Sequence, residues 1–413
     1  MNVTVENELE KTPVIWCFTF ISALNLMVAF CVSEYFNRQT LASILSFNAS
    51  DEPGPLAPYL YPAHAPFGKH YFGDFFQILQ MSRLHSPYIT VDNKLISQYP
   101  PIAHWFLYPF KIFDTRIAVI LYVLISIVFL SWAIHKLTLT LDLRTRPIVF
   151  LLFLLSGPAI SLIDRGNITL IIFTLTVLSL TVTMSEFNKV IVQVLSIGMK
   201  FFPMVFFLEV ERAQRSKNAC RSFFIEVSAV ILLSFLGFSL LGWGFGQNLK
   251  GFFSAFISQG NFLENSGISG VSLSAFIGAI QSLFDLEFGK ATIFMVLLVT
   301  IFSFITLLVQ YFGPISRKTL VEERLLVICS LICLVPTIVG TYQLVFYLIP
   351  LVMYLKHDLN KKVTSLNTFL LIVLTLPNRY EISGGVFLSN LVAAPCMLIL
   401  LINTLRIQVR RAG

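Results

Sequence analysis

The segment ITLIIFTLTVLSLTVTM, from Ile168 to Met184, contains no charged side chain and decides the fold class of this chain. Two similar apolar runs flank it, Pro147–Ile163 before it and Val190–Val210 after it. Runs of this length approach the roughly 20 residues that an α-helix needs to cross the hydrocarbon core of a bilayer. They therefore predict membrane helices rather than the core of a water-soluble domain.

The composition of the whole chain agrees with this prediction. Its 413 residues are 56% hydrophobic and only 12% charged, and the mean hydropathy is +0.79. Soluble domains usually carry about 25% charged residues, so half of the normal supply of solvating side chains is missing. These values exclude a soluble enzyme, a disordered chain and a secreted disulfide scaffold. We expect an all-α polytopic integral membrane protein.

Five short segments rich in Lys and Arg indicate which loops face the cytoplasm, because basic residues are enriched in cytoplasmic loops. They hold more than half of the 29 basic residues, so the net charge of +7 reports orientation and not affinity for nucleic acid. These segments are Lys136–Arg146, Glu211–Arg221, Arg317–Arg324, Lys356–Lys362 and Arg406–Arg411.

This pattern predicts a single membrane-embedded domain over residues 1–413, with its N-terminus inside. We expect a bundle of about 10–12 transmembrane helices. Two large extracytoplasmic loops, residues 37–114 and 243–290, should carry short amphipathic helices.

The apolar runs between Pro147 and Val210 do not fit that topology as three crossings. Both basic segments that flank them should be cytoplasmic, so only an even number of complete crossings is possible. One run must therefore be re-entrant or broken, and Lys200 with Pro203 marks the expected break, because proline removes a helical hydrogen bond. Irregular backbone at membrane depth persists only where protein or a watery cavity covers it, which favours a cavity beside Lys200.

The first outer loop contains the candidate catalytic acid, Asp74. A helix that begins there would place Gln77 and Met81 on the same stripe as Asp74. Asp followed three residues later by Gln is also close to a capping box, so the acid could serve only as a helix cap. Its position just outside the membrane, in a chain with few acids, favours a functional role.

Two basic residues are candidates for binding an anion. Arg165 lies between two apolar runs, and its planar guanidinium suits a phosphate. Lys200 lies within the third apolar run, where it could neutralise an anionic lipid head group. Each has a simpler interpretation, since Arg165 could pair locally at a turn and Lys200 could extend its ammonium group to the membrane surface. The residues alone leave both choices open.

No metal motif stands out in the sequence. The six cysteines lack the CxxC or Cys/His spacing of a zinc site. The four histidines of the first outer loop are not spaced as metal ligands, and we expect them at the surface or in structural roles. They are His64, His70, His85 and His104.

The order of these short motifs resembles glycosyltransferase family 87, the membrane-embedded C-type glycosyltransferases that include polyprenol-phosphate-mannose-dependent mannosyltransferases. The resemblance spans roughly residues 70–275, and the last third of the chain is similar only as generic membrane helices. A proline-rich stretch before Asp74 is longer than the usual linker of the family. The motifs are Gly73-Asp74-Phe75, Ser86-Pro87-Tyr88, Tyr99-Pro100-Pro101, Arg165-Gly166-Asn167, Lys200-Phe201-Phe202-Pro203, and Glu264-Asn265-Ser266 through Val271-Ser272-Leu273.

The resemblance implies a specific reaction. Such enzymes move a sugar, most commonly mannose, from a polyprenyl-phosphate donor to a lipid-linked or glycan acceptor hydroxyl, with inversion. Asp74 matches the expected general base. Arg165 and Lys200 match cations for the donor phosphate, with Arg165 preferred because its loop should face outward. The expected residues of the substrate cavity are Gln77, Tyr99, Asn167 and Asn265.

The same resemblance sets expectations for cofactors, partners and location. A sugar already carried on a lipid phosphate needs no nucleotide-binding domain, and protein cations can replace a metal, so no cofactor is expected. The partners are the donor, the acceptor and membrane lipids, without nucleic acid. We expect the plasma membrane, specifically a bacterial inner membrane, with the active site on the extracytoplasmic side.

Three rival functions are also compatible with a polytopic membrane protein. A transporter or lipid flippase would show internal repeat symmetry with broken helices in matching positions, and the sequence has no such pairing. A polysaccharide polymerase or ligase would need more outer-loop arginines than Arg38, Arg83 and Arg379 provide beyond Arg165. A non-catalytic scaffold is the third. The sugar, the acceptor, the linkage and the oligomeric state are not encoded in a recognisable pattern.

Overall fold

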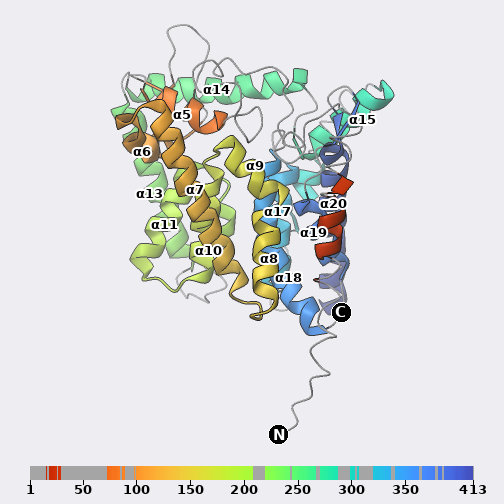
Figure 1. The fold of residues 1–413 in the computed structure, drawn as a ribbon. Helices are drawn as coiled ribbons and strands as arrows, with labels where there is room; N and C mark the ends of the chain where they lie inside the picture. The colour runs from red at the N-terminus through yellow and green to blue at the C-terminus, as the bar shows by residue number, and fades with distance from the viewer. Residues whose placement is uncertain are drawn as a thin grey trace. The chain divides into compact units, whose positions relative to one another are not determined.

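A computed structural model of the chain describes a set of segments that together form a helical protein (Figure 1). The only strands among these residues are β1 (Glu381–Ser383) and β2 (Val386–Phe387), which pair in an antiparallel hairpin. The predicted all-α membrane class is confirmed. The described residues are 15, 18–25, 27–28, 72–83, 86–88, 97, 99–207, 219–241, 244–266, 270–286, 298–302, 305–306, 320–335, 340–361, 365–376, 380–383 and 386–412.

The chain divides into two compact units, each built from segments that are separated in sequence. Unit 1 contains residues 1–49, 134–161 and 267–413, and unit 2 contains residues 50–133 and 162–266. The candidate acid Asp74 and both candidate cations belong to unit 2.

The helices of the two units have the following bounds, with α7 and α9 contributing residues to both units. Unit 2 contains α5 (Gly73–Arg83), α6 (Pro101–Leu107), η1 (Tyr108–Ile112), α7 (Thr115–Thr138), α9 (Gly157–Arg165), α10 (Thr169–Thr181), α11 (Glu186–Met199), α13 (Ala219–Leu240) and α14 (Phe245–Ser266). Unit 1 contains α8 (Thr145–Leu154), α15 (Leu273–Phe284), α17 (Val321–Leu334), η3 (Thr341–Tyr347), α18 (Leu348–Lys361), α19 (Leu366–Thr375) and α20 (Leu388–Ala412).

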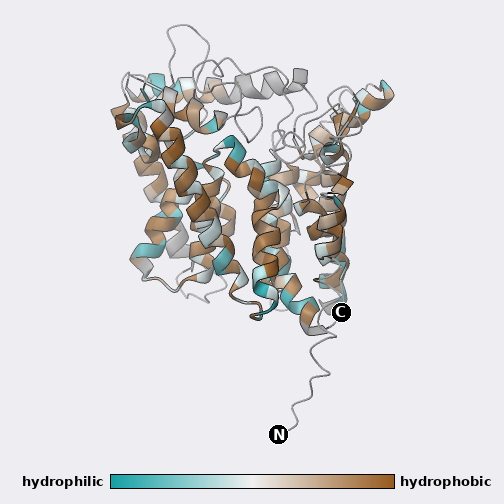
Figure 2. Ribbon diagram, viewed as in Figure 1, coloured by the Kyte–Doolittle hydropathy of each residue, from teal (hydrophilic) through white to brown (hydrophobic). Residues whose placement is uncertain are grey.

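Two helices in the described part of the chain are long and apolar enough to cross a membrane, namely Ile117–Thr138 in α7 and Leu388–Arg410 in α20. Two bent pairs would raise this number to four if each is one span: α8 with α9, bent by 46°, and α13 with α14, bent by 107°. Hydrophobic residues cover most of α7 and α8 (Figure 2). The total of about 10–12 crossings stays a prediction, because part of the chain lies outside the described residues.

Two of the predicted apolar runs, Pro147–Ile163 and Val190–Val210, are each interrupted within the run. Helix α11 ends at Met199, and Lys200 has an extended backbone with φ −153° and ψ 139°, as expected for a break at this position. A second interruption lies between α8 and α9, where Pro158 sits in the first turn of α9 and suits a helix start. No break was predicted at this position from the sequence. Lys200 therefore lies at the end of α11, and Arg165 is the last residue of α9, just before the α9–α10 turn.

Helix α6 packs closely against α11 and α13 because each of them has a glycine at the contact. A Cβ at Gly198 of α11 would lie 2.2 Å from Cδ1 of Ile102. A Cβ at Gly237 of α13 would lie 2.3 Å from Cβ of Pro101. Glycine at these two positions leaves room for the side chains of Ile102 and Pro101. The packing holds the start of α6 near the end of α11.

In unit 1, polar side chains join the C-terminal helices. Asn367 of α19 donates to the hydroxyl of Tyr354 in α18, at 3.1 Å. Its Oδ1 accepts from Nδ2 of Asn403 in α20, at 2.8 Å. Hydrogen bonds between helices of this kind help membrane bundles to associate, so these three residues fix the packing of α18, α19 and α20.

The glycine contact at α13 generates the first prediction. Gly237→Ala should lower the free energy of unfolding by about 1–3 kcal/mol, because the rigid ring of Pro101 cannot move away from an added methyl group. Thermal unfolding in detergent measures the change. Gly246→Ala is the matched control, since a Cβ at that position on α14 meets nothing within 4 Å. Equal midpoints for the two variants would contradict the proposed packing of α6.

Candidate functional site

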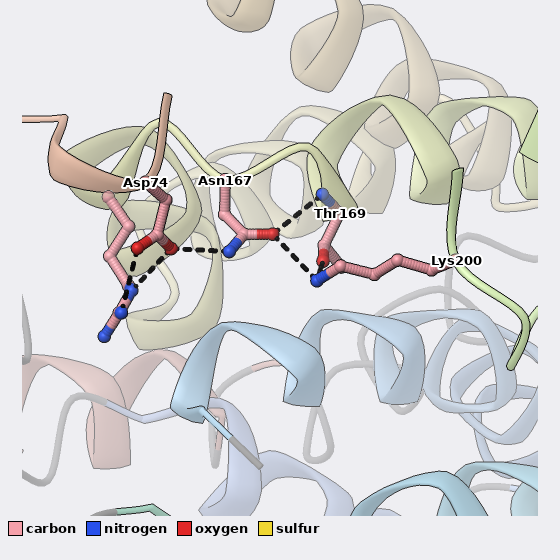
Figure 3. Close-up of polar contacts among 5 residues, drawn as sticks. Asp74, Asn167, Thr169 and Lys200 are labelled. Atoms are coloured by element: carbon pink, nitrogen blue, oxygen red, sulfur yellow. Dashed lines mark hydrogen bonds and ion pairs between the residues drawn. The ribbon is translucent and has the colours of Figure 1, made fainter. Parts of the chain in front are cut away.

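Asp74 lies in the first turn of α5 and is buried, with 8% of its surface exposed. Its carboxylate accepts two hydrogen bonds from Arg165, from Nε to Oδ2 at 2.9 Å and from Nη2 to Oδ1 at 3.1 Å. Asn167 donates a third through Nδ2, at 2.5 Å (Figure 3). The two bonds from the guanidinium form a bidentate pair, which is stronger and more directional than a single contact.

Asn167 connects the carboxylate to the second cation. Its Oδ1 accepts from the backbone N–H of Thr169 at 2.9 Å and from Nζ of Lys200 at 3.2 Å (Figure 3). Both partners can only donate, so the amide oxygen must face them and the amide nitrogen must face Asp74. Lys200 also donates to Oγ1 of Thr169, at 2.8 Å. One network therefore joins α5, the α9–α10 turn and the end of α11.

The α9–α10 turn brings these groups together through Gly166. Its φ is +61°, and a Cβ there would lie 2.9 Å from Cβ of Phe75 and 3.2 Å from Cβ of Phe72. Glycine is needed both for the left-handed backbone and for the missing side chain. The backbone N–H of Phe72 donates to the carbonyl of Asp164, at 2.9 Å. The start of α5 thus docks onto the turn, which brings the carboxylate of Asp74 to it.

Phe72, immediately before α5, has a strained backbone. Its φ is 58°, in the left-handed region that non-glycine residues rarely adopt. Such a conformation costs roughly 1–2 kcal/mol, and strain of this kind is concentrated at functional sites. The ring of Phe72 is buried, with 6% exposed. Packing of the ring and the hydrogen bond to Asp164 offset the strain, and together they set the direction in which α5 begins.

Tyr99 faces the second cation. Nζ of Lys200 lies 5.5 Å from the centroid of its ring, within the range of a cation–π contact. Tyr99 is itself buried, with 8% exposed, and its carbonyl accepts from the hydroxyl of Tyr88 at 2.8 Å. The ring therefore forms one wall beside the ammonium group of Lys200.

The Ser86-Pro87-Tyr88 motif anchors the segment between α5 and α6 on α14. Oγ of Ser86 donates to Oδ1 of Asn248, at 2.6 Å. A Cβ at Gly251 would lie 2.0 Å from the carbonyl oxygen of Tyr88, so glycine is required there. The ring of Tyr88 packs with Phe238 and Phe252. This motif serves the architecture that supports the site.

The structure brings together five of the seven residues that the sequence nominated for the site. They are Asp74, Tyr99, Arg165, Asn167 and Lys200. The other two are Gln77 on α5 and Asn265 on α14, whose side chains lie outside the described part of the structure. Thr169 was not predicted, because a threonine inside an apolar run carries no signal of its own.

Of the four loop histidines, His104 is described. It is buried with 2% exposed, in one of the structural roles that the sequence allowed. Burial lowers the pKa of His104 to about 3, with a smaller contribution from the charge of Lys111. Its ring is therefore neutral at physiological pH. His64, His70 and His85 lie outside the described residues.

The ion pair generates the second prediction, a double-mutant cycle on stability. Asp74→Asn and Arg165→Gln should show a coupling of about 0.5–3 kcal/mol, because each substitution removes the same bidentate contact. Chemical unfolding in detergent measures the four free energies.

The control cycle combines Asp74→Asn with Arg83→Gln. Arg83 lies nine residues along α5, about 13 Å away by helical rise, and its described hydrogen bonds go to Thr115 and Phe113. This cycle should be additive within about 0.5 kcal/mol. Additivity in both cycles would contradict the ion pair.

Comparison with known proteins gives the family. The sequence profile of glycosyltransferase family 87 matches residues 98–337, more than half of the chain. Comparison with curated proteins and with solved structures gave no match. The matched region contains Arg165, Asn167 and Lys200, whereas Asp74 precedes it and reaches it through hydrogen bonds. The resemblance carried by the short motifs is confirmed: the chain belongs to glycosyltransferase family 87 and is a membrane glycosyltransferase.

Proposed function

We propose that this enzyme transfers a sugar from a polyprenyl phosphate to the hydroxyl of a lipid-linked or glycan acceptor, with inversion. Mannose is the sugar that we propose first. The observation that carries this proposal is the network of one carboxylate and two cations in unit 2. An inverting transfer needs a base for the acceptor hydroxyl. It also needs positive charge where the phosphate leaves. The network contains groups suited to both tasks.

Asp74 is the proposed base. Asn167 donates to Oδ2 of its carboxylate, and a contact that is kept during the reaction gives the preorganisation that a catalytic group requires. An acceptor hydroxyl would donate to one of its oxygens and pass its proton there as the oxygen attacks the anomeric carbon. The bond from that carbon to the phosphate oxygen breaks in the same step, and the polyprenyl phosphate leaves as an anion.

Arg165 is proposed to couple the two substrates. Its guanidinium binds Asp74 in this structure, and a donor phosphate is a second anion suited to the same planar fork. When the phosphate binds the guanidinium, the carboxylate of Asp74 loses its two hydrogen bonds from Arg165. It can then accept a hydrogen bond from the hydroxyl of the sugar acceptor. The donor phosphate thus replaces Asp74 as the anion bound to Arg165, and the same step frees Asp74 to act as the base.

Lys200 is the proposed permanent contact for the donor phosphate. Its ammonium group donates hydrogen bonds to oxygens of Asn167 and Thr169, which orient it beside the ring of Tyr99. This assignment differs from the preference for Arg165 drawn from the sequence, because the structure shows the guanidinium on Asp74. Negative charge grows on the departing phosphate in the transition state, and a fixed cation there stabilises it.

The proposed location of the active site is the extracytoplasmic face of the plasma membrane, which we propose to be a bacterial inner membrane. The basic segments that should face the cytoplasm support it. They leave the segment that carries Asp74 on the outer side, where a polyprenyl-phosphate sugar would be presented by the lipid itself.

Sugar transfer tests the proposal directly. Purified protein in lipid vesicles should transfer label from one of a panel of radiolabelled polyprenyl-phosphate sugars, with a membrane lipid extract as the source of acceptor. Asp74→Asn should lower kcat by about 100- to 10,000-fold, because the amide cannot take the proton.

Asp285→Asn is the matched control for this experiment. Asp285 is the exposed C-cap of α15 in a left-handed conformation, with φ 52°, which Asn adopts readily. This variant should keep the wild-type rate. Full activity in folded Asp74→Asn would contradict its role as base, and no transfer by the wild type from any polyprenyl-phosphate sugar would contradict the donor class.

A further inference from the structure

We propose that His104, as its neutral Nδ1–H tautomer, is a positioning residue that locks the helix of Asp74 to the segment of Tyr99. This inference rests on the proposed function, because it concerns how Asp74 and Lys200 are held for the same reaction. The described hydrogen bonds of His104 go to Ser82 and Ser97, so it acts through the elements that carry Asp74 and Tyr99.

The imidazole of His104 lies between two serine hydroxyls from different segments. Its Nδ1 is 2.8 Å from Oγ of Ser82, near the end of α5. Its Nε2 is 2.7 Å from Oγ of Ser97, which precedes α6. Ser82 and Ser97 are buried, with 8% and 1% exposed. The contact therefore joins α5, α6 and the segment before α6 inside the protein.

The remaining hydrogen bonds of the two serines determine the tautomer. Oγ of Ser82 donates its single hydrogen to the carbonyl of Ile78, at 2.7 Å, so it accepts from Nδ1–H of His104. Oγ of Ser97 accepts the backbone N–H of Tyr99, at 3.1 Å, so its own hydrogen is available for Nε2. A hydroxyl has one donor and two acceptor positions. The Nδ1–H tautomer therefore satisfies every group in the relay.

The opposite tautomer does not satisfy the relay. With the proton on Nε2, the hydroxyl hydrogen of Ser97 would have no acceptor among its described contacts, at a buried position. Protonation of both nitrogens creates the same conflict at Ser97. A buried unpaired hydroxyl costs about 1–3 kcal/mol, so the neutral Nδ1–H form is strongly favoured. The lowered pKa of His104 agrees with a neutral ring.

One end of the relay controls α5. Asp74, Ile78 and Ser82 are spaced by four residues, so they lie on the same face of this helix. Rotation or sliding of α5 that moves Ser82 away from His104 would move the carboxylate of Asp74 by a similar amount. The docking of Phe72 on Asp164 fixes the first residues of α5, and the relay fixes its far end.

The other end of the relay controls the wall beside Lys200. The backbone N–H of Tyr99 is held by Ser97, and the backbone N–H of Ser97 donates to the carbonyl of Pro87 at 2.9 Å. The carbonyl of Tyr99 is held by the hydroxyl of Tyr88. The ring that faces the ammonium group of Lys200 thus has a fixed position relative to α5. A fully satisfied buried network is rigid and directional in a way that apolar packing is not.

His104→Phe tests the inference, since it keeps a ring of similar size and removes both hydrogen bonds. The kcat of the folded variant should fall by about 10- to 100-fold, as expected for a small misplacement of catalytic groups. In the Asp74→Asn background the same change should have no further effect on single-turnover transfer, because residues that act as one unit are not additive. His135→Phe, at an exposed position on α7, is the matched control and should keep wild-type activity.

The outcomes separate this inference from the proposed function. If Asp74→Asn keeps full activity, the proposed function fails. If Asp74→Asn is inactive but His104→Phe lowers kcat equally in both backgrounds, or changes only thermal stability, then His104 is merely structural and the inference is wrong. Ser97→Ala gives a smaller perturbation of the same relay and should show the same non-additivity, which keeps the test decisive should His104→Phe not fold.

A spectroscopic measurement tests the tautomer without any assay of activity. Histidine nitrogens labelled with ¹⁵N in the wild-type protein should show one ring with a protonated Nδ1 and an unprotonated Nε2 at neutral pH. That signal should be absent from His104→Phe, which assigns it. The Nε2–H form at this position, or a ring that gains a proton between pH 7 and 5, would overturn the proposal.

Discussion

The hydrogen-bonded carboxylate of Asp74 is the interaction on which the rest of the site depends. A buried negative charge is stable only where donors surround it, and here Arg165 and Asn167 provide them. Asn167 passes the connection on to Lys200, so the second cation is oriented through the same group. The arrangement requires α5 to approach the α9–α10 turn closely, and Gly166 permits this because it has neither a side chain nor a penalty for its positive φ.

The helix interruptions explain why this polar network can exist in so apolar a chain. Arg165 is the last residue of α9 and Lys200 follows α11, so both cations lie at helix ends, where the backbone leaves the helix. Irregular backbone within a membrane protein persists only where protein or water covers it. The buried side chains of Asn167 and Thr169 provide that cover between the two ends. The helix ends at Arg165 and Lys200 thus provide the polar positions from which the site is built.

The sequence predicted the charged members of the site better than the neutral ones. Asp74, Arg165 and Lys200 were identifiable because charged residues are conspicuous in an apolar chain, and Asn167 was identifiable from its motif. Thr169 and His104 were not assigned to the network, since single polar residues of these types occur in many structural roles. The direct ion pair joins residues 91 positions apart, and helical periodicity carries no information about such a contact. Because Arg165 binds Asp74 in the structure, we propose Lys200 as the permanent contact for the donor phosphate.

The proposed roles of Asp74 as the base and Lys200 as the phosphate contact are tested most directly by donor binding without turnover. The measurement is the Kd of a labelled polyprenyl-phosphate sugar for wild type, Asp74→Asn and Lys200→Met in the same lipid nanodiscs. Lys200→Met should bind about 10- to 100-fold more weakly, the value of one charge-assisted contact. Asp74→Asn should bind at least as tightly as wild type, because it removes the anion that competes for Arg165. Weakened binding by Asp74→Asn, or unchanged binding by Lys200→Met, would contradict this account.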